Sequence, residues 1–123
     1  MIVGMYMTRD AEVVSPEASL GEAIRKMSRR RIRRLVVTNK DSIVGMVCHR
    51  DLVNAFPDHV NPFSPVAETT AASADKIVRI MKSPVITIEH DKPIEQAARL
   101  MTAHRIGCLP VTSNGKLIGI ITE

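Results

Sequence analysis

Residues 81–123 read MKSPVITIEHDKPIEQAARLMTAHRIGCLPVTSNGKLIGIITE, and they align without a gap on residues 7–49 at one constant offset. Ten of the 43 aligned pairs are identical, and many of the others exchange one aliphatic residue for another. The identical pairs are Met7/Met81, Ala23/Ala97, Arg25/Arg99, Met27/Met101, Arg31/Arg105, Ile32/Ile106, Leu35/Leu109, Val37/Val111, Thr38/Thr112 and Gly45/Gly119. A unit of this length that occurs only twice does not suit an open solenoid, which needs several stacked copies. The repeat predicts two halves that pack face to face about a pseudo-two-fold axis, so that equivalent surfaces meet or create paired clefts.

The composition indicates a soluble cytoplasmic protein with an aliphatic core. The chain has no Trp, one Tyr and two Phe, which argues against the aromatic stacking platforms of single-strand nucleic-acid binders. We expect its two cysteines to be reduced thiols. No apolar run is long enough to span a bilayer, and residues 1–6 lack the layout of a signal peptide. A formal charge of +4 predicts moderate attraction to phosphates but no dedicated nucleic-acid surface.

Each copy is predicted to contain a strand, a helix, two strands and a further helix. Short strands are expected at 12–14 and 85–88. The first helix begins with Ser19 and Glu22, whose spacing is that of a capping box. The second begins after Pro93, which is favoured in the first turn. The expected buried faces, at three- and four-residue spacing, are Leu20, Ala23, Ile24 and Met27 in copy one, and Ile94, Ala97, Ala98 and Met101 in copy two.

Two strands are predicted after the helix in each copy. They lie at 35–38 and 43–47 in copy one, and at 109–112 and 117–121 in copy two. Asn114-Gly115 predicts a tight hairpin, because both residues tolerate positive φ. A short helix is expected at 49–56, stopped by Pro57, and a helical lead-in to copy two at 75–81. The predicted organisation is a first repeat at 1–56, a linker at 57–74 and a second repeat at 75–123, which stops before its last helix.

Four motifs resemble those of the cystathionine β-synthase (CBS) domain pair. They are Met-x-x-x-Val-Ile-Thr (81–87), Arg-Ile-Gly-Cys-Leu-Pro-Val (105–111), Gly-Ile-Ile-Thr (119–122) and Gly-Met-Val-Cys-His-Arg-Asp-Leu (45–52). Met1-Ile2-Val3 and Ile-Gly-Cys-Leu-Pro-Val look more narrowly like the acetoin-utilisation type. The resemblance implies an α/β (α+β-like) fold of two βαββα repeats, and a homodimer of flat, disk-like shape.

The resemblance also implies an adenosine ligand, such as AMP, ADP, ATP or S-adenosylmethionine, bound between the repeats. The expected nucleotide-binding residues are Met46, Cys48, His49, Arg50, Asp51, Ile86, Ile106, Gly107 and Cys108. Met46, Ile86 and Ile106 can sandwich a purine, while Gly107 permits close approach of the backbone. Asp51 can accept the ribose hydroxyl protons, and we expect the segment from Cys48 to present free N–H groups to phosphate, helped by His49 and Arg50.

A second cleft would use equivalent residues from the other copy and is expected to differ from the first. Its residues are Glu12, Ile32, Arg33, Ile120 and Thr122. Arg33 and Arg34 stand where copy two has Gly107 and Cys108, so their bulk is expected to fill the purine space. In the first cleft, Cys48 stands where the family has Thr or Ser, so the phosphate contact there is expected to be weaker. The acidic position three residues after Thr122 lies beyond Glu123.

Other interpretations stay open beside the nucleotide sensor. Asp51 is also a plausible first-turn helix cap, retained for stability alone. For the basic run Arg29–Arg34, a solvated helix end is preferred over a surface that binds phosphate or nucleic acid. The histidines lack metal-ligand spacing, and no nucleophile, base and orienter can be assembled, so neither a metal site nor an enzyme is expected. The alternative functions are a ligand-free dimerisation module and, less favoured, a nucleic-acid-binding protein.

Overall fold

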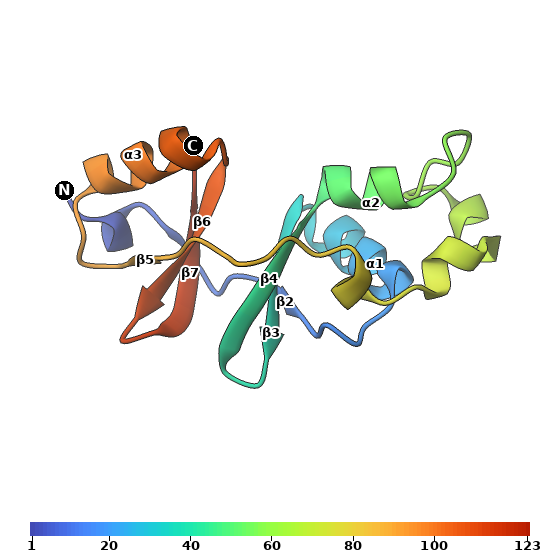
Figure 1. Ribbon diagram of the computed structural model, residues 1–123, viewed down its shortest axis with the longest axis horizontal. Helices are drawn as coiled ribbons and strands as arrows, with labels where there is room; N and C mark the ends of the chain where they lie inside the picture. The colour runs from blue at the N-terminus through green and yellow to red at the C-terminus, as the bar shows by residue number, and fades with distance from the viewer. The chain divides into compact units, whose positions relative to one another are not determined.

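The computed structural model describes residues 1–123 and is a mixed α+β structure with two sheets (Figure 1). The α-helices are α1 (Leu20–Arg30), α2 (His49–Ala55) and α3 (Ile94–His104). The 3₁₀ turns are η1 (Val3–Met5), η2 (Pro65–Thr69), η3 (Ala71–Ala74) and η4 (Ile77–Arg79). The strands are β1 (Thr8–Arg9), β2 (Val13–Val14), β3 (Arg34–Asn39), β4 (Ser42–Cys48), β5 (Ile88–Glu89), β6 (Cys108–Ser113) and β7 (Lys116–Thr122). None of the helices could cross a lipid bilayer.

The chain forms two compact units, and each takes its lead-in segment from the other copy of the repeat. Met1–Ala11 packs with Ile86–Glu123, whereas Glu12–Val85 forms the second unit. The first unit contains the sheet β1-β7-β6-β5, and the second contains β2-β3-β4. These divisions differ from the boundaries expected at 56, 57 and 74, which follow the repeat in the sequence and stay a prediction. The segments that precede each repeated helix are thus exchanged between the two halves of the sequence.

In the unit Glu12–Val85, helix α1 covers one face of the three-stranded sheet. β2 runs parallel to β3, and β3 pairs antiparallel with β4. The side chain of Ser19 accepts a hydrogen bond from the Glu22 N–H at 3.1 Å, which is the serine half of the predicted capping box. The predicted buried face of this helix is confirmed by the burial of Leu20, Ala23, Ile24 and Met27. Helix α1 ends at Arg30, and the C-cap residue Arg31 adopts a left-handed conformation with φ of 56°.

In the unit of Met1–Ala11 and Ile86–Glu123, helix α3 uses a narrower buried face than predicted. Ala97 and Met101 are buried and Ile94 is half-buried, but Ala98 is exposed. The prediction for Ala98 is therefore wrong. Its counterpart in α1, Ile24, lines a cavity between α1 and the linker. Helix α3 has no linker packed beside it within its unit, so that side of the helix meets solvent.

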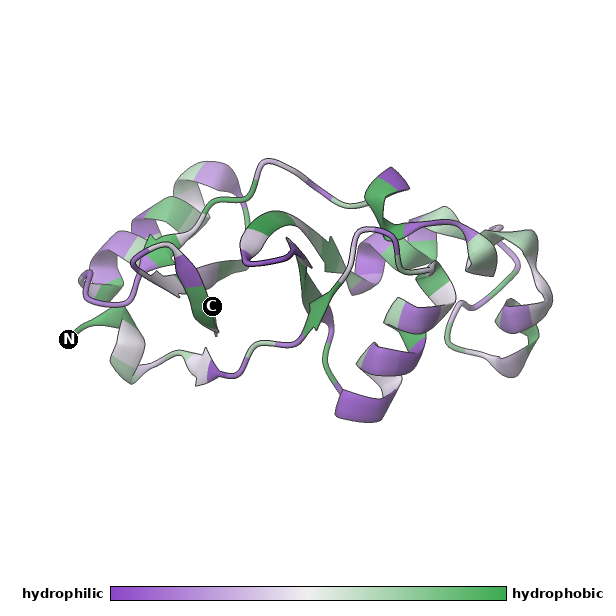
Figure 2. Ribbon diagram, turned by 90° about the horizontal axis from the view of Figure 1, so that it is seen from below, coloured by the Kyte–Doolittle hydropathy of each residue, from purple (hydrophilic) through white to green (hydrophobic).

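The turns and short elements follow local sequence signals closely. Asn114 and Gly115 have φ of 52° and 82° between β6 and β7, which confirms the predicted hairpin. The strand expected at 12–14 contains β2, whereas the strand expected at 85–88 overlaps β5 only at Ile88. The linker expected at 57–74 contains η2 and η3 and lies beside α1 (Figure 1). Figure 2 shows helices that alternate between hydrophobic and hydrophilic residues, which is typical of helices with one buried face.

Candidate functional site

The junction between β4 and α2 holds Asp51 in a fixed position. The Cys48 N–H donates a hydrogen bond to Asp51 Oδ2 at 2.8 Å, and the Cys48 side chain faces the Asp51 N–H in the reciprocal half of a capping box. The Asp51 side chain is only 8% exposed. A carboxylate that accepts this bond satisfies one of the N–H groups that a helix start leaves unpaired. The cap predicted as an alternative role of Asp51 is therefore present.

The second oxygen of Asp51 faces a lysine that sequence reasoning did not select. Lys82 Nζ lies 3.5 Å from Asp51 Oδ1. The backbone of Lys82 pairs with that of Met46 through two hydrogen bonds, of 2.9 and 3.0 Å. Lys82 belongs to the segment that leads into copy two, far from β4 in the sequence. Local sequence patterns around Lys82 or in β4 therefore do not predict that the two pair. Because its side chain is 73% exposed, the ion pair is weak and readily exchanged.

His49 is held by its backbone and by a stacked ring. Its N–H donates to the Arg33 carbonyl at 2.8 Å. Its imidazole stacks on Phe63 with ring centroids 4.6 Å apart and an angle of 4° between the planes. Burial, and then the charges of Arg33 and Arg50, lower the pKa of His49 below its ordinary value. The ring is therefore neutral at neutral pH.

The expectation of free N–H groups in the segment from Cys48 is wrong for Cys48, the N-cap residue of α2, and for His49, the first residue of α2. The Cys48 N–H is bound by Asp51, and the His49 N–H is bound by Arg33. The cause is local. The hydrogen bond between the His49 N–H and the Arg33 carbonyl continues the strand pairing to the first residue of α2, and the Asp51 carboxylate caps the helix by accepting from Cys48. Arg50 is exposed and Met46 is buried. Side chains, and not a cradle of backbone donors, supply the polar chemistry of this junction.

The expected site residues of copy two lie in the other compact unit. Ile86 and Ile106 are half-buried, Gly107 is half-buried, and Cys108 is buried at the start of β6. The Ile106 N–H is bonded to the Met101 carbonyl, and the Gly107 carbonyl accepts from the Glu123 N–H, each at 3.0 Å. Cys108 lies opposite Thr122 in the β6–β7 ladder. Ile86 and Ile106 pack as partly buried side chains against the hydrophobic core of this unit.

The residues of the expected second cleft divide in the same way between the units. Glu12 Oε1 forms an ion pair with Arg30 Nε at 3.2 Å, and Ile32 is half-buried. Arg33 is exposed and Arg34 is half-buried. Arg34 lies opposite Cys48 in the β3–β4 ladder, and its counterpart Cys108 lies opposite Thr122 in the β6–β7 ladder. In the other unit Ile120 is half-buried and Thr122 is exposed. Arg29, Arg30 and Arg31 are exposed at the end of α1, which agrees with a solvated helix end.

Comparison with known proteins identifies the family. A family model described as the CBS domain matches residues 3–58 and 77–123. The chain belongs to the CBS domain family. It is 30% identical to a CBS domain-containing protein of Dictyostelium discoideum, covering 100% of this chain and 86% of that protein. It is 34% identical to a 33.4 kDa protein encoded in a ribosomal RNA operon of Thermofilum pendens, covering 95% of this chain and 39% of the relative.

A third relative, the inosine-5′-monophosphate dehydrogenase of Methanocaldococcus jannaschii, is 35% identical over 93% of this chain but only 20% of the enzyme. The CBS pair thus spans a minority of the Thermofilum and Methanocaldococcus proteins. CBS domains are in general regulatory and not catalytic modules. The described residues bring together no group of three or more His, Cys, Asp or Glu side chains that could hold a metal.

Solved structures confirm the tandem repeat and the α+β class. A CBS-domain-containing protein from Agrobacterium tumefaciens has a TM-score of 0.73 and 33% identity, covering 93% of this chain and 84% of that chain. An acetoin utilization protein from Vibrio cholerae has a TM-score of 0.80 and 26% identity, covering 99% and 84%. A CBS domain pair in complex with 5′-methylthioadenosine and S-adenosyl-L-methionine shares the fold, with a TM-score of 0.80 at 22% identity, covering 99% and 89%. The likeness to this last structure shows a shared fold.

Proposed function

We propose that this CBS pair is a regulatory module that binds an adenosine compound, of the class of AMP, ADP, ATP or S-adenosylmethionine, at the β4–α2 junction. One observation carries the proposal: Asp51 is fixed through one carboxylate oxygen and faces the cationic Lys82 with the other. The CBS pair that binds 5′-methylthioadenosine and S-adenosyl-L-methionine supports the same ligand class. In this proposal the module senses metabolic state, including energy state, and passes occupancy to a partner protein.

The geometry of the junction supports a separate proposed role for each of its polar side chains. Asp51 Oδ2 is engaged by the Cys48 N–H, so Oδ1 is the oxygen that accepts the ribose hydroxyl protons. A ligand hydroxyl replaces a weak contact there, because the Lys82 ammonium is 3.5 Å away and mostly exposed. Lys82, once displaced from Asp51, is positioned to meet a phosphate or carboxylate of the same ligand. Arg50 is the exposed cation of the first turn of α2 and serves the same anion.

The remaining contacts are proposed from the family resemblance. Ile86, Ile106, Gly107 and Cys108 are proposed to contact the purine, and Met46, Cys48 and His49 the rest of the ligand. Glu12, Ile32, Arg33, Ile120 and Thr122 are proposed as a second, weaker site. A homodimer in the cytoplasm is proposed as the working form, and light scattering coupled to size-exclusion chromatography tests its stoichiometry. No membrane partner is proposed, and nucleic acid is not the proposed ligand.

Calorimetric titration tests the proposed ligand class. AMP, ADP, ATP, S-adenosylmethionine and 5′-methylthioadenosine are each titrated into the wild-type protein, into Asp51→Asn and into the control Asp41→Asn, which changes an exposed turn residue. We expect one adenosine compound to bind once per chain, and Asp51→Asn to weaken it by about 1.5–3 kcal/mol while Asp41→Asn leaves it unchanged. No heat and no thermal stabilisation with any of the five would instead favour a ligand-free structural module.

A further inference from the structure

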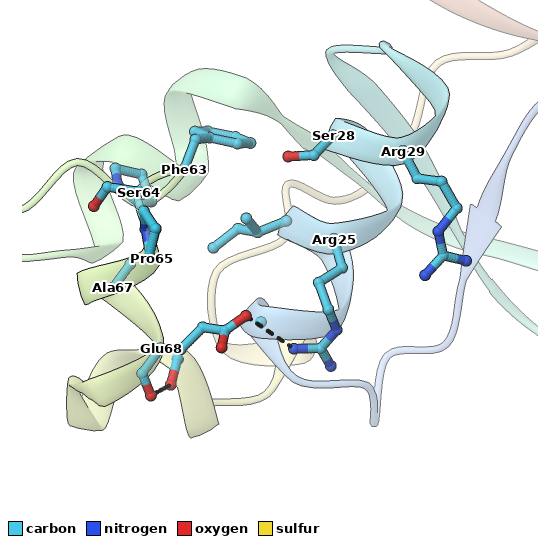
Figure 3. A pocket seen from close by; sticks show the side chains of 12 residues that line it. Arg25, Ser28, Arg29, Phe63, Ser64, Pro65, Ala67 and Glu68 are labelled. Carbon is cyan, nitrogen blue, oxygen red and sulfur yellow. Dashed lines mark hydrogen bonds and ion pairs between the residues drawn. The ribbon is translucent and has the colours of Figure 1, made fainter.

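A cavity of about 530 Å³ lies between α1 and the linker, within the unit Glu12–Val85 (Figure 3). Helix α1 contributes Ile24, Arg25 and Ser28, and the linker contributes Phe63 and Ala67 on the facing wall. Ile24 and Ala67 are buried, so the lining is apolar between its polar edges. The volume falls within the range of small-molecule pockets, roughly 300–1,000 Å³.

The charged groups of this linker cavity favour an anion. Arg25 Nη1 lies 4.0 Å from Glu68 Oε1, and these side chains are 51% and 68% exposed. At that distance and exposure the ion pair contributes little, so an incoming anion can take the place of Glu68 (Figure 3). Arg29, one turn further along α1, also lines the cavity and forms no ion pair anywhere in residues 1–123. The Arg25 guanidinium therefore faces one weakly engaged carboxylate, and Arg29 adds a second positive charge to the lining.

The linker wall is ordered before any ligand arrives. The Phe63 N–H donates to Asn61 Oδ1 at 2.9 Å, and Ser64 Oγ donates to the Asn61 carbonyl at 2.7 Å. The Phe63 ring is also stacked on His49, which fixes it from the side of α2. A wall that is already fixed loses little conformational entropy when a ligand binds. This order distinguishes the linker cavity from a flexible surface groove.

We propose that the linker cavity binds a small molecule with a flat apolar body and one carboxylate group, and that this site is distinct from the β4–α2 junction. The apolar body lies between Ile24, Phe63 and Ala67, and the carboxylate takes Arg25 from Glu68 with a planar, two-pronged hydrogen bond. A cation is disfavoured at this site, since the lining carries two arginines and one glutamate.

The repeat supplies a matched control. Arg99 and Thr102 in α3 are the counterparts of Arg25 and Ser28, but α3 has no linker beside it within its unit. Substitutions at Arg99 and Thr102 therefore change the same chemistry on the same kind of helix without touching the cavity.

The test uses 2-naphthoate as the probe, with neutral 2-naphthalenemethanol as its uncharged analogue, in NMR titrations of the full chain. We expect 2-naphthoate to bind once per chain and to shift the His49 ring signals, through Phe63, but not those of His104 in α3. Arg25→Gln should weaken it about tenfold, the fold-change of one charge-assisted hydrogen bond, and Glu68→Gln should strengthen it because the competing carboxylate is gone. Ser28→Trp, at an exposed position that faces the cavity, should abolish binding.

The proposal is overturned if the neutral alcohol binds as tightly as 2-naphthoate, because the arginines then recognise nothing. It is equally overturned if Arg99→Gln or Thr102→Trp has the same effect as its counterpart, or if Glu68→Gln weakens binding. These titrations contain no adenosine compound, so their result is independent of the proposed nucleotide site.

Discussion

Met81 lies directly over Gly45, so that a Cβ atom on Gly45 would come within 2.5 Å of the Met81 sulfur. The equivalent pair in the other unit repeats the arrangement: a Cβ atom on Gly119 would come within 2.8 Å of the Met7 sulfur. Met7/Met81 and Gly45/Gly119 are two of the identical pairs of the repeat. Each methionine belongs to the lead-in of one copy and packs on the last strand of the other. The exchange of lead-in segments therefore explains why these four positions match.

The first prediction compares the two glycines by substitution with alanine. Gly119→Ala should destabilise the fold by about 1–3 kcal/mol, because its Cβ would also come within 2.6 Å of the Thr8 carbonyl oxygen, a backbone atom that cannot move aside. Gly45→Ala should cost less, since its close neighbours belong to the flexible Met81 side chain. Denaturant unfolding measures both values.

Double-mutant cycles provide the control for this comparison. The cost of Gly45→Ala should shrink in a Met81→Ala background, whereas Gly119→Ala should keep most of its cost in a Met7→Ala background. A larger cost at Gly45 than at Gly119 would contradict the proposed packing.

Local signals in the sequence predict much of the fold, and non-local pairings account for what they miss. Ser19 with Glu22 predicts the start of α1, and Asn114-Gly115 predicts the β6–β7 turn, because each signal acts over a few residues. The sequence leaves Asp51 with two interpretations, and its spacing from Cys48 cannot reveal that Lys82 faces its second oxygen. Ala98 is mispredicted for a related reason: helical periodicity gives the same face to both copies, but the linker covers only α1.

The second prediction separates the structural role of Asp51 from its proposed ligand role. Asp51→Ala should destabilise the fold by about 1–3 kcal/mol, because the Cys48 N–H loses its acceptor at a largely buried carboxylate. Asp51→Asn keeps an acceptor oxygen and should cost less. Lys82→Gln should change stability by no more than about 1 kcal/mol, as expected of an exposed partner. Equal stability of Asp51→Ala and wild type in thermal unfolding would rule out the cap.

The third prediction concerns Glu89, which accepts hydrogen bonds from the Thr112 hydroxyl and from the Asn114 N–H of the hairpin turn. These bonds, the Thr112 bond first, lower the pKa of Glu89. A carboxyl with a lowered folded-state pKa stabilises the fold above its ordinary value, about 4.3, and that stability is lost as pH falls from there through the lower folded value. In Glu89→Gln, this part of the acid-induced loss of stability should disappear. The control Glu95→Gln, which changes an exposed residue of α3, should lose stability as the wild type does. Identical pH–stability curves for wild type and Glu89→Gln would refute the assignment.

The last prediction concerns His49, whose pKa is lowered by burial first and then by Arg33 and Arg50. Protonation is disfavoured in the folded state, so stability is complete above the ordinary histidine value, about 6.5, and declines as pH falls from there to the folded-state pKa. Phe63→Ala should raise the pKa more than Arg33→Gln does, because it exposes the ring that the stack covers. Arg31→Gln, which removes an exposed charge that does not act on this ring, should leave it unchanged. NMR titration of the His49 ring measures all three, and a larger rise in Arg33→Gln than in Phe63→Ala would show that charge, and not burial, sets the pKa.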